Sequence, residues 1–210
     1  QFGFAFRYIA EQLNSTEFGL YMVNYHAKEP TISANLGGYQ GIDMDALTNL
    51  LAGVAGSQAG QLANGLATAD VLGNIQAHRR YAEDIRMYGF SFNTTVGQAS
   101  VFGEVAYRPN LPIGVAATND LIGDLANGAA AAAGGQTINI GGQMVTLDSQ
   151  INNAERVEAF NTSLGTIYNF GPGLSFDSMF GVFELASEHL RGSSLHYTAY
   201  DGSTRYYAGT

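Results

Sequence analysis

The 210-residue chain has a formal net charge of −9, and charged residues make up 13% of it, against about 25% in ordinary soluble domains. The acidic balance argues against a nucleic-acid partner, because nucleic acids select basic surfaces. Cysteine is absent and no run of about 18 apolar residues occurs, which excludes disulfides, thiolate metal sites and transmembrane helices.

The first predicted element is a β-hairpin over about 1–27. Large apolar residues occupy every second position of FGFAFRY (2–8), and the alternation returns in TEFGLYMVNYHA (16–27) after a short polar turn at 11–15. Such alternation is typical of a half-buried soluble strand and equally of a strand in a membrane barrel.

Two further hairpins are predicted, over about 83–108 and 155–190. Each consists of two alternating strands, which are joined by a turn at 94–98 in the first hairpin and by the Gly-Pro-Gly sequence 171–173 in the second. In the last strand Val182 and Glu184 share one parity, so a bulge near Gly181 is expected to change the face there.

The lengths of the connections favour a membrane barrel over a soluble β-sandwich. Short turns alternate with the long segments 28–82 and 109–154, as in outer-membrane barrels whose long loops lie outside the cell. The predicted strands have about 10 or more residues, enough for a tilted strand to cross a bilayer, whereas strands of soluble sheets have about 5 to 6. The expected fold is an all-β, antiparallel transmembrane β-barrel.

The first long loop is expected to contain two helices, over 42–54 and 58–74. Asp43 or Asp45 would cap the first of them. That helix carries an apolar stripe made of Leu47, Leu50, Leu51 and Val54. Such helices could form a plug, collect an apolar ligand near the mouth of the barrel, or only pack on each other.

The second long loop is expected to contain one helix and one small hairpin. The helix covers 118–133, is capped by Thr118 or Asn119, and ends at Gly134 and Gly135. The hairpin covers 136–147 around a two-residue Gly-Gly turn.

The strand parity predicts which polar residues face the inside of the barrel. If Phe2, Phe4 and Phe6 meet lipid, the candidates that face the lumen are Arg7, Glu17, Tyr21, Glu104, Arg108, Asn161 and Ser163. An arginine at mid-bilayer on the lipid face would cost about 2–4 kcal/mol, which places Arg7 inside. These residues either line a path for a permeant or form an internal network that stiffens the wall.

No catalytic pattern is found. His26, His78, His189 and His196 lie far apart and show no metal-ligand spacing. No serine stands in a nucleophile elbow, and no calcium-loop sequence is complete. We therefore expect no enzyme activity, no catalytic or metal-ligating residues and no cofactor.

The sequences LNSTEFGLYMVNYH, EDIRMYG and GEVAYRPNLP resemble those of the domain-of-unknown-function 1302 (DUF1302) family of Gram-negative bacteria, common in pseudomonads. Its members are predicted outer-membrane proteins, considerably longer than 210 residues. Several occur beside a periplasmic or lipoprotein partner family and an RND-type transporter. The resemblance implies a bacterial outer-membrane location and envelope transport of apolar compounds, and it supplies no site residues.

Six strands cannot close a barrel, for which about eight is the smallest number. We therefore expect residues 1–210 to be one domain, an internal section of a larger, porin-like barrel with helical extracellular loops. The expected function is passage, export or transfer of hydrophobic or amphipathic small molecules through the outer membrane, in contact with its lipid. The alternatives are a structural or adhesive envelope barrel and a soluble β-rich binding domain.

Overall fold

The computed structural model describes residues 1–114, 118–173, 175–192 and 196–206, with 118–120 described by their backbone alone. It is mostly antiparallel β-sheet, as predicted. The chain divides into two compact units. The sheet unit comprises Gln1–Lys28, Ala82–Pro112 and Arg156–Gly192, and the helical unit comprises Glu29–Tyr81, Ile113–Glu155 and Ser193–Thr210.

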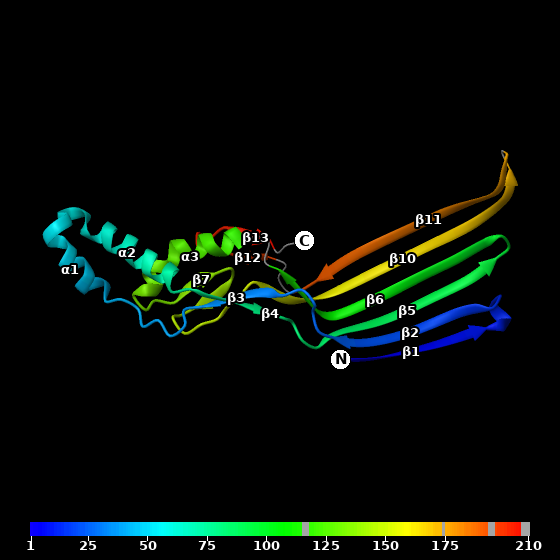
Figure 1. The fold of residues 1–210 in the computed structure, drawn as a ribbon, viewed down its shortest axis with the longest axis horizontal. Helices are drawn as coiled ribbons and strands as arrows, with labels where there is room; N and C mark the ends of the chain where they lie inside the picture. Colours follow the sequence, from blue (N-terminus) through cyan, green and yellow to red (C-terminus); the bar gives the residue numbers. More distant parts are fainter. Residues whose placement is uncertain (115–117, 174, 193–195, 207–210) are drawn as a thin grey trace. The chain divides into compact units, whose positions relative to one another are not determined.

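The sheet unit is built on one six-stranded sheet in the order β1-β2-β5-β6-β10-β11. The bounds are β1 (Phe2–Ala10), β2 (Thr16–Tyr25), β5 (Ile85–Val96), β6 (Ala99–Gly114), β10 (Ala154–Gly173) and β11 (Phe176–Arg191). The three turns that join neighbouring strands lie at the same end of this sheet (Figure 1). In the described part of the chain β1 and β11 are its open edges, so the barrel does not close here.

Of the three turns predicted for the six-stranded sheet, the first two lie where the sequence predicts them and the third does not. The first contains the 3₁₀ turn η1 (Glu11–Leu13), and the second has only two residues between the paired Val96 and Ala99. The prediction of a turn at 171–173 is wrong, because Gly171 pairs with Met179 and Gly173 with Phe176 inside the β10–β11 ladder.

The bulge predicted near Gly181 is also wrong. Gly181 pairs with Tyr168 in regular register. The register shifts lie nearer the turn, between Asn169 and Gly171, where β10 has the extra residue, and between Gly171 and Gly173, where β11 has it. The second shift spans Pro172, which has no backbone N–H to donate to the ladder. Val182 and Glu184 therefore share a face without any irregularity between them.

The six-stranded sheet exposes an apolar face on which large side chains meet across the strands. Phe6 pairs with Leu20, Leu20 with Phe90, and Phe90 with Val105. Each of these side chains is exposed, Leu20 to 52%. In a soluble sheet an apolar face of this kind would be buried against other elements. Here no described residues cover it.

The described residues of the helical unit form three helices and several short strands. The helices are α1 (Met44–Ala55), α2 (Ala59–Gly73) and α3 (Thr118–Ala133), with the 3₁₀ turn η2 (Gly56–Gln58) between the first two. The strands are β3 (Thr31–Asn35), β4 (Gln76–Arg80), β7 (Ile138–Ile140), β8 (Gln143–Val145), β9 (Ile151–Asn152), β12 (His196–Thr198) and β13 (Thr204–Tyr206).

The helices lie within two residues of their predicted bounds. The Asp43 side chain accepts a hydrogen bond from the Ala46 N–H at 2.9 Å and caps α1. After α3, Gly135 has φ +80°, and the Gln136 N–H donates to the Ala131 carbonyl at 3.0 Å, which closes the helix. The predicted cap at Thr118 or Asn119 lies outside the described side chains. In the described residues no helix is long and apolar enough to span a membrane.

The core of the helical unit lies where α2, α3 and the β7–β8 hairpin meet. Val71, Ala129 and Ile140 are fully buried there. The predicted Gly-Gly turn is confirmed, with φ +54° at Gly141 and +77° at Gly142 between the paired Ile140 and Gln143. Two positive φ angles define the tight hairpin turn that glycine makes possible.

Candidate functional site

The residues predicted to face a lumen lie on the polar side of the six-stranded sheet. Arg7 and Glu17, on neighbouring strands, form an ion pair with an Nη1–Oε1 distance of 3.5 Å. The two side chains are 66% and 42% exposed. An ion pair this exposed stabilises a protein by at most about 1 kcal/mol.

Tyr21 lies flat along the same face. Its hydroxyl is 3.3 Å from Ser91 Oγ. A Cβ atom on Gly19 would lie 2.7 Å from Tyr21 Cε2, so the glycine at this position makes room for the ring. Glu104 stands directly opposite Ser91 on β6. The sheet therefore brings Tyr21 and Glu104 to one polar row.

Arg108 and Asn161 form a second polar row between β6 and β10. The Arg108 Nη1 donates to Asn161 Oδ1 at 2.5 Å. Asn161 stands opposite Glu188, and Ser163 opposite Ala186. In the described part of the chain no ion pair involves Glu104, Glu184 or Glu188. The sheet thus groups all seven predicted residues in polar rows, and their role stays a prediction.

The apolar stripe of α1 is strongly exposed. No residue of this helix is buried, and Leu50 and Val54 are 75% and 89% exposed. Leu47 and Leu51 are half-buried. The stripe therefore remains available as an apolar surface.

The titratable groups that the structure describes in the helical unit show no arrangement typical of acid–base catalysis. The Tyr39 hydroxyl donates to Asp70 Oδ2 at 2.7 Å. Burial, together with this carboxylate, raises the pKa of Tyr39 to about 12, which disfavours a tyrosinate. The Ser203 hydrogen bonds lower the pKa of Asp201. Within the described residues no three His, Asp or Glu side chains could hold a metal ion together.

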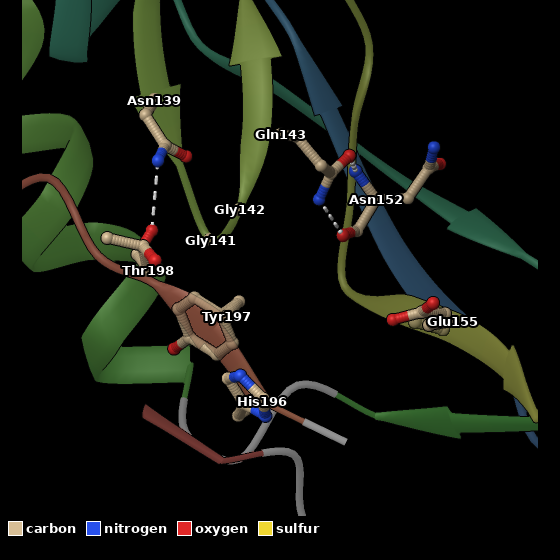
Figure 2. A pocket seen from close by; sticks show the side chains of 10 residues that line it. Asn139, Gly141, Gly142, Gln143, Asn152, Glu155, His196, Tyr197 and Thr198 are labelled. Carbon is tan, nitrogen blue, oxygen red and sulfur yellow. Dashed lines mark hydrogen bonds between the residues drawn. The ribbon is translucent and has the colours of Figure 1, made fainter. Parts of the chain in front are cut away.

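A polar cavity of about 590 Å³ surrounds the Gly-Gly turn of the helical unit (Figure 2). Three separate segments of the chain line it, namely Asn139 with Gly141–Gln143, then Asn152 with Ala154–Glu155, and His196–Thr198. Apart from the turn glycines and His196, which the search for metal-ligand spacing included, none of these residues stood out in the sequence. Nothing local marks them, because the fold brings them together from segments that lie far apart in the chain.

Side-chain hydrogen bonds fix the walls of this cavity. Gln143 donates from Nε2 to the Asn152 carbonyl at 2.7 Å and accepts from the Asn152 N–H at 3.1 Å, so it pairs with the backbone of β9 as a strand would. Asn139 Nδ2 donates to the Thr198 carbonyl at 3.0 Å (Figure 2). The hairpin is thus tied to β9 and to β12.

A family model described as protein of unknown function (DUF1302) matches residues 1–209. No curated protein and no solved structure matches the chain.

Proposed function

We propose that this chain, which belongs to the DUF1302 family of proteins of unknown function, is a section of a larger antiparallel β-barrel in the bacterial outer membrane. In this proposal the whole protein moves hydrophobic or amphipathic small molecules through that membrane. The apolar face of the sheet meets lipid, the polar face lines the lumen, and the helical unit lies outside the cell.

The exposed apolar face carries the proposal. Every strand of the sheet contributes large apolar side chains to it, including Phe6, Leu20, Phe90, Val105, Leu164 and Leu185, and all of these are exposed. Soluble monomers rarely expose apolar patches larger than a few hundred Å². Lipid is the solvent in which such a face is favourable, and the opposite face with its ion pair and hydrogen bonds suits a lumen.

The open edges support the larger barrel. A bilayer offers no water to the unpaired backbone groups of β1 and β11, so each edge needs a partner strand. Because six strands alternate in direction, β1 and β11 run in opposite directions and further strands can continue the antiparallel order.

Two observations support movement of apolar compounds in particular. The α1 stripe offers an apolar surface to a hydrophobic compound, and acids outnumber bases on the polar face, which disfavours phosphate and nucleotide permeants. The family resemblance extends the proposal to outer-membrane lipid, a periplasmic or lipoprotein partner and an RND-type transporter as partners.

The second candidate is a structural envelope barrel without transport. The Arg7–Glu17 pair and the Arg108–Asn161 hydrogen bond favour it, because both join neighbouring strands across the polar face and would brace the wall. The two functions differ in whether compounds pass, which a transport assay measures.

Charging the α1 stripe should slow the passage of hydrophobic compounds. We expect Leu50→Asp with Leu51→Asp to lower the uptake of the hydrophobic dye N-phenylnaphthylamine severalfold in cells or vesicles that carry the protein. Small hydrophilic dyes should pass unchanged or faster, because the stripe is not part of their path.

The matched control is Thr48→Asp with Asn49→Asp, which adds the same charge to the same helix outside the stripe. It should leave the hydrophobic flux unchanged. If the stripe variant folds and transfers the hydrophobic dye like the unmodified protein, the helices are only a cover and the transport proposal loses its support.

A further inference from the structure

We propose that the cavity around the Gly141–Gly142 turn binds a neutral, hydroxyl-rich ligand of the saccharide class. This inference concerns the helical unit alone and does not depend on transport. The cavity volume of about 590 Å³ lies within the range of about 300–1,000 Å³ that small-molecule sites occupy.

The lining excludes several other classes of ligand. Among the described residues that line it there is no lysine or arginine, which disfavours phosphate and other anions. Glu155 is the one carboxylate among them, which is too few for a divalent cation. The remaining side chains are mostly amide, hydroxyl and imidazole groups, which do not suit an apolar ligand. Groups of this kind match hydroxyls, which both donate and accept hydrogen bonds.

Several groups remain available for such hydroxyls. The Glu155 carboxylate forms no hydrogen bond or ion pair with the residues that the structure describes, and it is half-buried at the cavity. The Asn152 Oδ1 accepts from Arg80 at 3.2 Å, which leaves its Nδ2 as a donor. The Asn139 Oδ1 is buried without a partner among the described residues, and a ligand hydroxyl would recover that hydrogen bond if the side chain turned toward the cavity.

The walls are pre-organised by contacts that hold the turn in place. The buried Asp124 accepts from the Gly141 N–H at 3.0 Å. A Cβ atom on Gly142 would lie 2.8 Å from Tyr197 Cβ, so glycine is needed both for its positive φ and for this close approach. A site whose walls are already fixed loses less entropy when a ligand binds.

Binding of simple sugars to the purified protein tests the proposal. The protein is kept in lauryldimethylamine oxide micelles, because the head group of this detergent is not a sugar. Saturation-transfer NMR is run with glucose, galactose and N-acetylglucosamine, and with methyl phosphate, whose methyl protons report binding, as the contrasting anion. We expect transfer to at least one sugar and none to methyl phosphate.

The Glu155→Gln variant should weaken binding of that sugar about tenfold, because it replaces a charge-assisted hydrogen bond with a neutral one. Met144→Gln, on the same hairpin but outside the cavity lining, is the matched control and should bind like the unmodified protein. The proposal is overturned by a lack of transfer to all three sugars, by transfer to methyl phosphate alone, or by unchanged affinity in Glu155→Gln. None of these results bears on the barrel.

Discussion

Leu20→Arg is expected to destabilise the protein in bilayers by about 2–4 kcal/mol, the cost of an arginine on the lipid face near the midplane. Leu20 lies on the apolar face between Phe6 and Phe90. Tyr21→Arg, one residue along, should be much milder, because Tyr21 lies on the polar face and gives up mainly its contact with Ser91. The measurement is the free energy of unfolding in phospholipid vesicles.

Leu20→Ala serves as the control, since it removes the side chain without adding charge. Its effect should be smaller than that of Leu20→Arg. Equal penalties for arginine at 20 and 21, or the reverse order, would show that the two faces are assigned wrongly.

Ile140→Ala is expected to destabilise the helical unit by about 2–5 kcal/mol, the usual cost of deleting a buried isoleucine side chain. Ile140 is fully buried between α2, α3 and the β7–β8 hairpin. Met144 is on the same hairpin and 69% exposed, so Met144→Ala should change the stability little. Denaturant unfolding followed by helical circular dichroism measures both.

Similar losses from the two substitutions would contradict the assignment of the core. A loss from Ile140→Ala that is confined to the helical signal would further indicate that the sheet unit keeps its structure without a fully packed helical unit.

The local patterns predicted the parts of the fold that local chemistry decides. The alternation of Phe2, Phe4 and Phe6 predicts that they share one face of the sheet, because side chains along a strand alternate with a period of two. The register agrees, since Phe4 pairs with Met22 and Phe6 with Leu20. Asp43 caps α1 as its side chain predicts, and the Gly141–Gly142 turn has the required positive φ angles.

Features that depend on partner strands were not predictable from the sequence. Gly-Pro-Gly at 171–173 has the composition of a turn, yet the ladder with β11 continues through it. The sequence after Arg108 contains Pro109 and Pro112 and predicts a loop, whereas β6 continues to Gly114. In both places pairing with a neighbouring strand overrides the local preference.

In the candidate sites, too, local patterns predicted some features, and others depend on the pairing of distant segments. The alternation along each strand places Arg7 and Glu17 on the same face of the sheet, and the two side chains form an ion pair there. The contact between Arg108 and Asn161 needed the β6–β10 pairing, which no local pattern specifies. The cavity at the Gly-Gly turn combines Asn152 and His196 from distant segments, and only the fold brings them together.

The central claim is that one face of the sheet meets lipid and the other does not. Because the chain contains no cysteine, single cysteines can be introduced along β2 and spin-labelled in the protein reconstituted into vesicles. Collision with oxygen, which concentrates in the bilayer, is then compared with collision with a water-soluble nickel chelate. We expect labels at Phe18, Leu20 and Met22 to collide mainly with oxygen, and labels at Glu17, Tyr21 and Val23 mainly with the chelate. Equal accessibility at both sets of positions, or the reversed pattern, would contradict the account.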